Sequence, residues 1–547
     1  MSLGLQQLDR FISRILSTLF HQSDKLPEHL LRQLLLYDPE RAMTPIDKID
    51  GRISGSIHLG NKGLNMIRLK QFGLPIPPGF IITTEVFRYR DVISAYPPAE
   101  QQFRAQVAKD IERVEAVTGF RFGSPDNPLL FSVRSGAAIS QPGMMDTFLN
   151  VGLNEKIVAG ISARAGNEWF AWDNYRRFLQ CWGMSWGLKR NDFDAIISEF
   201  KLRLEIPYKK DLTGAQMKTV ALAYKKMILD AGFTIEEDPF EQLLMIIRKV
   251  FDSWESAKAK TYRKIIGISD DWGTAVTVQT MVYGNISQES GSGVIFTHNP
   301  RWSGDIMRLW GDFTVGNQGE DVVSGLVRTL PVSLIQQDFE MRETDVTLET
   351  HFPEIYKALK TWTNDLIYDK GWSPQEIEFT FESASADDLY VLQSRDMTIR
   401  SRKEARAFLF EQTKKKRLLG HGIGVSGGAM SGRIVFDLEE IGAWRKREPE
   451  TPLILIRSDT VPDDIQEIYG ADGLLTARGG LTSHAAVVAH RLEKTCVVGC
   501  VDLDCNEKLR ECTWGKTLLK AGDYIGIDGK QGAVYRGRLK VEVSSRE

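Results

Sequence analysis

The sequence predicts an α/β protein in which one large two-lobed domain precedes a smaller α/β domain. From about residue 51, short apolar runs alternate with glycine and proline; helical patterns dominate from about 155 to 265, and strand-like runs return to about 396. A segment that begins with strands, continues with inserted helices and ends with strands indicates one domain with two lobes. Beyond residue 433, strand-like runs flank a helix predicted over 483–492, which is a β-α-β unit.

The same textures divide the chain. We expect a helical extension at 1–50, a two-lobed domain at 51–400 with a helical insertion at about 155–265, a linker at 401–432 and a final domain at 433–547. The linker is predicted because a basic run ending at Arg417 is followed by a glycine-rich stretch, 420–432, which indicates a flexible joint.

The extension carries an apolar stripe at helical spacing, formed by Leu8, Phe11, Ile12, Ile15, Leu16, Leu19 and Phe20. We expect this stripe to pack on its own domain, because most amphipathic helices do. A partner or a membrane surface is the alternative.

Composition excludes several classes of function. The chain has 547 residues and a net charge of −3 at pH 7, so no bulk basic field favours nucleic acid. The N-terminus lacks a basic start followed by an apolar run, so we expect no signal peptide. No stretch is apolar over the ~18 residues that a membrane span needs, so we expect no membrane span. Five cysteines, an odd count, argue against a disulfide framework. We expect reduced, packed thiols in a cytoplasmic protein; a zinc site among the four at 496–512 is the alternative.

The sharpest local feature is a histidine at a predicted helix start, within GGLTSHAA at 479–486. The glycines permit a tight turn, and Thr482 or Ser483 can cap the helix. His484 then lies in the first turn, where free amide donors and the helix dipole suit a phosphate. The dipole also disfavours a protonated ring, so we expect a neutral, nucleophilic His484 near pH 7. A histidine that merely packs at a helix start is the alternative.

Nucleotide-binding candidates lie upstream. The chain has no G-x-x-x-x-G-K-[ST] loop, so a P-loop is excluded. Lys62 and Arg134 lie among predicted strands and turns, and both could bind phosphates. Glu378 and Gln393 place oxygen atoms on adjacent predicted strands, as Mg²⁺ prefers. Arg395, two residues after Gln393, faces the same side of its strand.

The histidine motif, GGLTSHAAVVA at 479–489, resembles that of the pyruvate phosphate dikinase and phosphoenolpyruvate synthase family, in which a histidine on a swivelling domain carries a phosphoryl group. Other stretches resemble, in order, the family's ATP-grasp domain: LGNKG (59–63), LPIPPGF (74–80), SVRSGA (132–137), PGMMDT (142–147), YRRF (175–178), VQTMV (278–282), QGEDVV (318–323), QEIEFT (375–380) and LQSR (392–395). The PGMMDT form resembles the dikinase branch.

The resemblance implies a two-lobed ATP-grasp domain with a helical insertion, followed by a swivelling phosphohistidine domain. It implies that His484 is phosphorylated from ATP and that Thr482 and Ser483 belong to its catalytic motif. It further implies roles for Gly143 in a loop over the phosphates and for Arg177 at the terminal phosphate or inorganic phosphate. ATP is expected to contact Lys62, Arg134, Glu376, Arg395 and the adenine-side linker Gln279, Met281 and Val282, with Mg²⁺ on Glu378 and Gln393.

The expected activity is autophosphorylation of His484 with ATP converted to AMP, with inorganic phosphate as a second acceptor that gives pyrophosphate. The family's barrel for pyruvate or phosphoenolpyruvate is not matched in this sequence, so we expect the barrel on a separate chain, or a different acceptor. A non-catalytic ATP-binding regulatory module is the third alternative. Departures from the family pattern are His298 and His490, where arginine is expected, and the bulkier Leu64.

Overall fold

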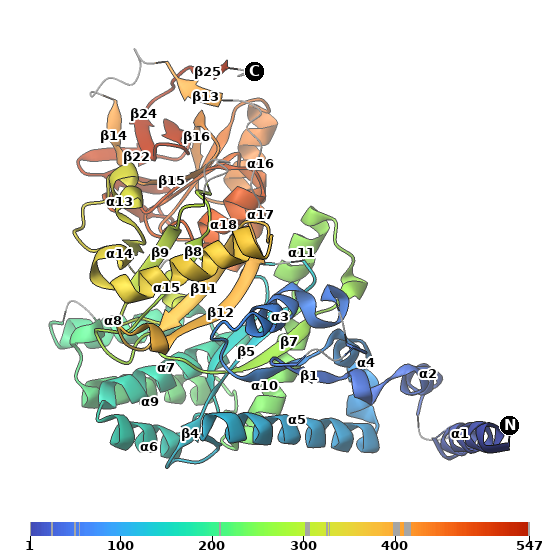
Figure 1. The fold of residues 1–547 in the computed structure, drawn as a ribbon. Helices are drawn as coiled ribbons and strands as arrows, with labels where there is room; N and C mark the ends of the chain where they lie inside the picture. The colour runs from blue at the N-terminus through green and yellow to red at the C-terminus, as the bar shows by residue number, and fades with distance from the viewer. Residues whose placement is uncertain are drawn as a thin grey trace.

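The computed structural model describes residues 2–22, 26–48, 51–53, 55–139, 141–206, 209–300, 307–323, 327, 329–397, 405–409 and 417–544. Figure 1 shows two parts of unequal size, which we call the N-terminal body (26–397) and the C-terminal lobe (405–544). The lobe sits on one side of the body, above helix α15 (Pro353–Asn364) in this view. No helix in the described ranges combines the length and apolar character that crossing a bilayer requires.

Two sheets form the framework of the body. In the described residues, sheet I has the strand order β1-β2-β7-β5-β6 and sheet II the order β10-β9-β8-β11-β12. All neighbouring strands in both sheets run antiparallel. Sheet I consists of β1 (Met43–Pro45), β2 (Gly79–Ile82), β5 (Phe131–Gly136), β6 (Thr147–Val151) and β7 (Ala275–Thr280), and sheet II of β8 (Gly291–Phe296), β9 (Trp310–Val315), β10 (Leu330–Pro331), β11 (Gln375–Phe381) and β12 (Leu389–Asp396).

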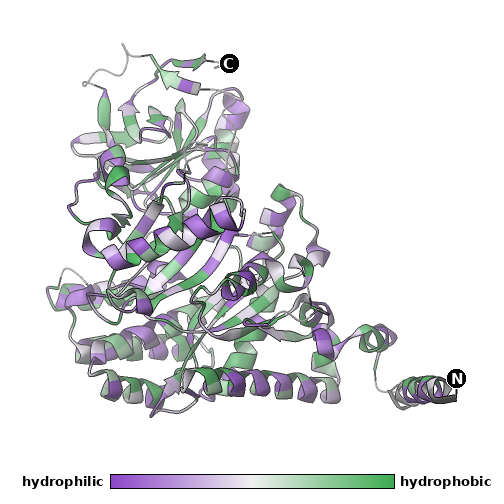
Figure 2. Cartoon of the chain, viewed as in Figure 1, coloured by the Kyte–Doolittle hydropathy of each residue, from purple (hydrophilic) through white to green (hydrophobic). Residues whose placement is uncertain are grey.

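Helices cover the two sheets. Between β6 and β7 the chain is helical from Glu155 to Ile266, the stretch for which helices are predicted. Figure 2 shows polar and apolar residues alternating along α5 (Pro97–Thr118), whose buried positions Phe103, Val107 and Ile111 recur every four residues. The remaining helices of the body are α2 (Glu28–Leu36), α3 (Ser56–Gln71), α4 (Thr84–Ala95), α6 (Glu155–Ala165), α7 (Glu168–Ser185), α8 (Arg190–Arg203), α9 (Gly214–Asp230), α10 (Pro239–Ser253), α11 (Ala257–Ile266), α12 (Gly319–Val323), α13 (Leu334–Glu340) and α14 (Leu348–His351); β3 (Arg121–Phe122) and β4 (Pro128–Leu129) form a short pair.

The C-terminal lobe is built on a mixed sheet whose described strands follow the order β14-β24-β23-β16-β17-β18-β19-β15. Strands β16 to β19 are parallel neighbours, and helix α18 (His484–Arg491) follows β18. The elements are β13 (Ala405–Phe408), β14 (Leu418–His421), β15 (Ile423–Ser426), β16 (Ala429–Val435), α16 (Leu438–Arg447), β17 (Leu453–Arg457), α17 (Ile465–Gly470), β18 (Gly473–Thr476), β19 (Thr495–Val498), β20 (Leu503–Asn506), β21 (Glu511–Trp514), β22 (Thr517–Lys520), β23 (Tyr524–Asp528), β24 (Ala533–Arg536) and β25 (Val541–Ser544). His484 thus lies beyond the carboxyl ends of parallel strands, where α/β sheets bind ligands.

The glycine-rich stretch at 420–432 is not the flexible joint that we expected. It holds β15 and parts of β14 and β16, all within the sheet of the lobe. A Cβ atom on Gly424 would lie 2.7 Å from the carbonyl oxygen of Gly529, and one on Gly428 would lie 2.6 Å from that of Arg406. These glycines are therefore required because backbones approach closely.

The N-terminal stripe also differs from expectation. Helix α1 (Ser2–Gln22) lies at the edge of the molecule, apart from both sheets (Figure 1). Leu8, Phe11 and Ile12 are exposed, at 52%, 62% and 45%; the side chains of Leu16, Leu19 and Phe20 lie outside the described residues. The prediction that this stripe packs on its own domain is wrong for its first half, because no sheet surface lies beside it.

The cysteines are free thiols. Burial raises the pKa of Cys505 and of Cys512 to about 12, which leaves both thiols protonated and unreactive. No group of three or more His, Cys, Asp or Glu side chains in the described part of the chain is arranged to hold a metal ion.

Candidate active site

Local hydrogen bonds fix the start of helix α18. Ser483 is the N-cap: its hydroxyl accepts a bond from the Ala486 amide at 3.4 Å and donates one to the carbonyl of Gly480 at 2.8 Å. Of the two predicted caps, Ser483 fills the role. The Thr482 hydroxyl is buried and has no hydrogen-bond partner in the described structure. Gly479 adopts a φ of +104°, which favours glycine over other residues.

The ring of His484 is buried against a loop of the N-terminal body. A Cβ atom on Gly143 would lie 2.7 Å from Nδ1 and 3.0 Å from Cε1 of His484. Gly143 itself has a φ of +71°. The opposite ring nitrogen, Nε2, is buried and makes no hydrogen bond in the described structure. One edge of the imidazole is thus covered by the PGMMDT loop, and the other carries an unused nitrogen.

Burial lowers the pKa of His484 to about 4, and the positive charge of Lys258 adds to the effect. Lys258, on α11, also pairs with Asp146 of the PGMMDT loop at 4.0 Å. The expectation of a neutral ring near pH 7 is therefore supported. Desolvation is the larger of the two causes found, and the predicted contribution of the helix dipole remains a prediction.

A ladder of charged and polar pairs lies on β11 and β12. Glu376 is directly opposite Arg395, and Glu378 is opposite Gln393. Arg395 forms an ion pair with Glu376, and the Gln393 amide nitrogen donates a hydrogen bond to Glu378. These four side chains lie on one face of sheet II, as their spacing predicts.

Sheet I and α3 bring cations to the same ladder. Arg134, on β5, reaches Glu378 at 3.6 Å, and its Nε is buried without a hydrogen-bond partner in the described structure. Lys62 is half-buried, and desolvation lowers its pKa to about 8 despite the opposing effect of Glu378. Lys62 lies in helix α3, not in a turn as expected, two residues after a kink at Gly60. Three cations thus face two carboxylates, an excess of positive charge that an anionic ligand would balance.

The donor set fits a hard divalent cation in part. Glu378 offers a carboxylate, and rotation of the Gln393 amide would turn its oxygen toward the same point. Mg²⁺ takes few protein ligands and completes its shell with phosphates and water. Glu378 and Gln393 are therefore the residues that would hold it.

Arg177 lies in a separate buried cluster. Its guanidinium donates to Asp173 at 2.8 Å and to both oxygens of Asp321, at 2.9 and 2.6 Å. Asp321 is itself buried, whereas its neighbour Glu320 is exposed. Asp321, which holds the Arg177 guanidinium, was missed as a residue of the candidate site, although it lies in the QGEDVV motif.

The end of β7 falls within the predicted adenine-side linker, so one predicted residue lies in the strand and the other two follow it. Gln279 belongs to the strand, pairs with Gly79 on one side and Ser132 on the other, and is not part of a linker. Its side-chain amide donates to the carbonyl of Pro77 at 3.2 Å. Met281 and Val282 follow, and the amide of Met281 is bonded to the carbonyl of Leu130 at 2.9 Å. Met281 and Val282 begin the connection from β7 to β8, and their contact with adenine remains a prediction.

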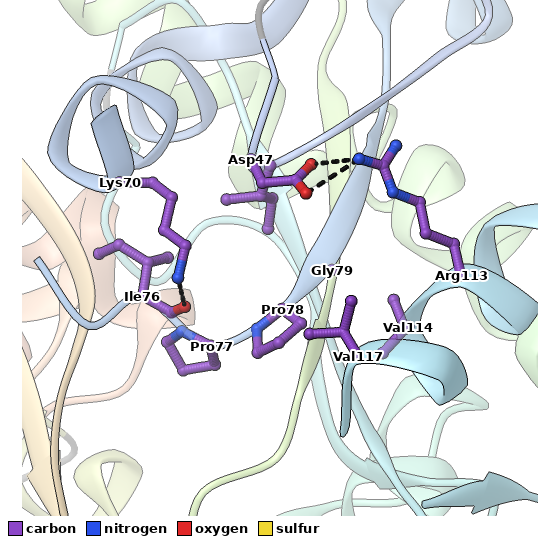
Figure 3. Close-up of a pocket in the computed structure, with 10 residues that line it drawn as sticks. Asp47, Lys70, Ile76, Pro77, Pro78, Gly79, Arg113, Val114 and Val117 are labelled. Carbon is purple, nitrogen blue, oxygen red and sulfur yellow. Dashed lines mark hydrogen bonds and ion pairs between the residues drawn. The ribbon is translucent and has the colours of Figure 1, made fainter. Parts of the chain in front are cut away.

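A pocket near the N-terminal segment is not this site. Figure 3 shows it between Pro77, Pro78 and the side chains of Val114 and Val117, with Asp47 paired to Arg113 at its rim. Its volume is about 60 Å³, well below the ~300 Å³ at which ligand pockets begin. None of the predicted site residues lines it.

Sequence comparisons agree with this two-part arrangement. Residues 99–351 match the family "Pyruvate phosphate dikinase, AMP/ATP-binding domain", and residues 449–532 match "PEP-utilising enzyme, mobile domain". The chain is thus an α/β protein in which a nucleotide-binding domain of the ATP-grasp type precedes a mobile phosphohistidine-type domain.

Curated relatives narrow the class. The pyruvate, phosphate dikinase of Clostridium symbiosum is 33% identical over 516 residues, which cover 91% of this chain and 58% of that protein. The enzyme of Rickettsia conorii is 35% identical (90% and 57%), and chloroplastic pyruvate, phosphate dikinase 1 of Zea mays is 36% identical (88% and 52%). The chain therefore belongs to the pyruvate phosphate dikinase family of phosphotransferases. It spans little more than half the length of these relatives.

Proposed function

We propose that this chain transfers a phosphoryl group from ATP to Nε2 of His484 and then passes it to an acceptor. One observation carries the proposal. The His484 ring is docked against the PGMMDT loop of the nucleotide-binding body, with Nε2 buried and unpartnered in the described structure. A histidine that only stabilised its helix would be expected to use both ring nitrogens in hydrogen bonds or leave them in water.

The proposed first step breaks the bond between the β-phosphorus and the oxygen that bridges to the α-phosphate. The lone pair of Nε2 forms the new P–N bond, and AMP departs with the bond electrons. Nucleophilic attack requires an unprotonated Nε2, which burial of His484 favours. Lys62, Arg134 and Arg395 offset charge on the phosphate oxygens, and bound Mg²⁺ would supply further Lewis-acid stabilisation.

The terminal phosphoryl group remains attached after this step. We propose that it passes to inorganic phosphate, giving pyrophosphate, and leaves the former β-phosphoryl group on His484. Arg177, whose guanidinium is held by Asp173 and Asp321, is the side chain that we assign to this second phosphate. Pyruvate is the acceptor proposed for the histidine-bound group, because the relatives carry pyruvate in their names.

Labelled nucleotide tests the proposal. The protein is incubated with Mg²⁺, inorganic phosphate and ATP carrying ³²P at the β or the γ position. Acid-labile, base-stable label from the β position only, together with AMP, is expected. Label from the γ position alone would instead indicate an ordinary kinase, and bound but uncleaved ATP would indicate a regulatory module. Addition of pyruvate then tests the acceptor: release of label as phosphoenolpyruvate supports it, and retained label favours another acceptor or a separate chain.

A further inference from the structure

A turn of the C-terminal lobe lies in direct contact with sheet II of the body. A Cβ atom on Gly480 would lie 2.5 Å from Oδ2 and 3.0 Å from Cγ of Asp312, and 2.7 Å from Oγ1 of Thr329. These three nearest atoms all belong to the body. Because real Cβ contacts essentially never fall below 3.0 Å, any side chain at position 480 would push the two parts of the molecule apart.

The surface that receives Gly480 cannot easily move aside. Asp312, on β9, is fully buried; its Oδ1 accepts hydrogen bonds from Arg342 at 2.7 Å and from Thr329 at 3.1 Å. Arg342 is held in turn by Glu340 at 2.6 Å, and Glu340 accepts a bond from the Trp310 indole at 3.0 Å. Rotation of the Asp312 carboxylate would break a buried ion pair, which is costly. Its other oxygen, Oδ2, has no hydrogen-bond partner in the described structure and faces Gly480.

Gly480 is coupled to His484 within the lobe. The amide and the hydroxyl of Ser483 both donate to the carbonyl of Gly480, at 3.1 and 2.8 Å, and Ser483 caps the helix that begins at His484. A displacement at Gly480 is therefore transmitted to the ring. Gly480 is not among the glycines with positive φ, so the backbone of the lobe itself would accept alanine there.

We propose that Asp312 and Thr329 form the receptor for the Gly480 turn and that this contact sets how deeply His484 enters the nucleotide site. The inference rests on the proposed function and names its positioning residues. Gly480 acts through its lack of a side chain, and Asp312 through a carboxylate fixed by Arg342. Misplacement of reacting atoms by about 1 Å can cost a hundredfold in rate.

The test compares Gly480→Ala with Gly442→Ala on α16, where a Cβ atom would meet nothing within 4 Å. We expect Gly480→Ala to keep the wild-type melting temperature and ATP affinity, to raise the radius of gyration measured by small-angle X-ray scattering, and to lose about a hundredfold in the rate of His484 labelling. Gly442→Ala should match the wild type in all four measurements. Adding Asp312→Ala to Gly480→Ala should restore part of the compactness and of the labelling.

A second variant acts from the other side of the contact. Thr329→Leu places a larger side chain against Gly480 and should reproduce the effects of Gly480→Ala. Agreement between the two variants would show that the effect does not arise from misfolding of either part. A wild-type radius of gyration and labelling rate in both variants would overturn the inference. If the wild type takes no label at all, the proposed function fails, but the scattering comparison still decides whether this contact holds the lobe in place.

Discussion

The two sides of the candidate active site differ in how they use charge. On the nucleotide side, Lys62, Arg134 and Arg395 are half-buried beside Glu376 and Glu378, and the three cations outnumber the two carboxylates. On the histidine side, the His484 ring is buried against Gly143 and has an unused Nε2. The first arrangement suits a polyanion, and the second suits a neutral nucleophile. The contrast agrees with the proposal that the body binds the charged nucleotide and the lobe supplies the nucleophile, and each side can be tested separately.

The largest expected effect comes from removal of the nucleophile. His484→Ala should reduce labelling from β-³²P ATP to background, whereas the ATP dissociation constant measured by calorimetry should stay within about twofold, because the charged ladder is untouched. His490→Ala, on the same helix, is the matched control and should retain the label. Label that survives His484→Ala would place the acceptor elsewhere and remove the contrast between the two sides.

The nucleotide side should respond to loss of one carboxylate. Glu378→Gln removes a charge that faces Arg134 and the metal position, so labelling at a fixed, low Mg²⁺ concentration should fall by about 10–100-fold. A higher Mg²⁺ concentration should recover part of the loss. Glu354→Gln, at an exposed position on α15, is the control. An unchanged Mg²⁺ dependence in Glu378→Gln would contradict the metal assignment.

A pH titration of ATP binding tests the role of Lys62. The pKa of Lys62, lowered to about 8, means that the ammonium loses its charge as the pH rises through 8 in the free protein. ATP affinity should therefore fall by about tenfold between pH 7.5 and 9.5. Lys62→Arg keeps its charge over this range and should flatten the curve. A wild-type affinity that is level to pH 9.5 would be the contrary result.

The smallest expected effect concerns Lys258. The docked ring has a pKa of about 4 against 6.5 for an ordinary histidine, so the undocked state binds more protons between these values and docking weakens as the pH falls from 6.5 toward 4. The labelling rate should decline as the pH falls through this window. Above pH 6.5, titration of His484 should have no effect on the rate. Lys258→Met removes the lesser of the two causes and should move the acid limb slightly to higher pH. A move to lower pH would contradict the assigned charge effect.

Local patterns predicted much of the site. Strand periodicity indicated that Gln393 and Arg395 share a face, and the glycines before His484 indicated a tight turn at a helix start. Both depend on residues close in sequence, for which backbone geometry gives the answer. The α/β class and the family were likewise confirmed by the fold and the comparisons. The roles assigned to individual site residues remain predictions.

Contacts between distant segments were not predictable in this way. The cause of the low pKa of His484, the approach of Gly143, and the meeting of Gly480 with Asp312 depend on packing across 168 to 341 positions of sequence. Asp321 was overlooked because an acidic residue in a motif looks like surface charge until its burial is known. The exposed first half of the α1 stripe was predicted wrongly because periodicity identifies an apolar face but not what covers it.

The glycines at 420–432 bear on how a moving lobe would be studied. A common way to stiffen a suspected hinge is to replace glycine by alanine, which restricts the backbone. Here a side chain at Gly424 would meet the turn at Gly529, and one at Gly428 would meet Arg406 on β13, so either replacement would disturb the packing of the lobe. A variant of this stretch with slow catalysis would therefore report a distorted lobe and not the rate at which the lobe moves.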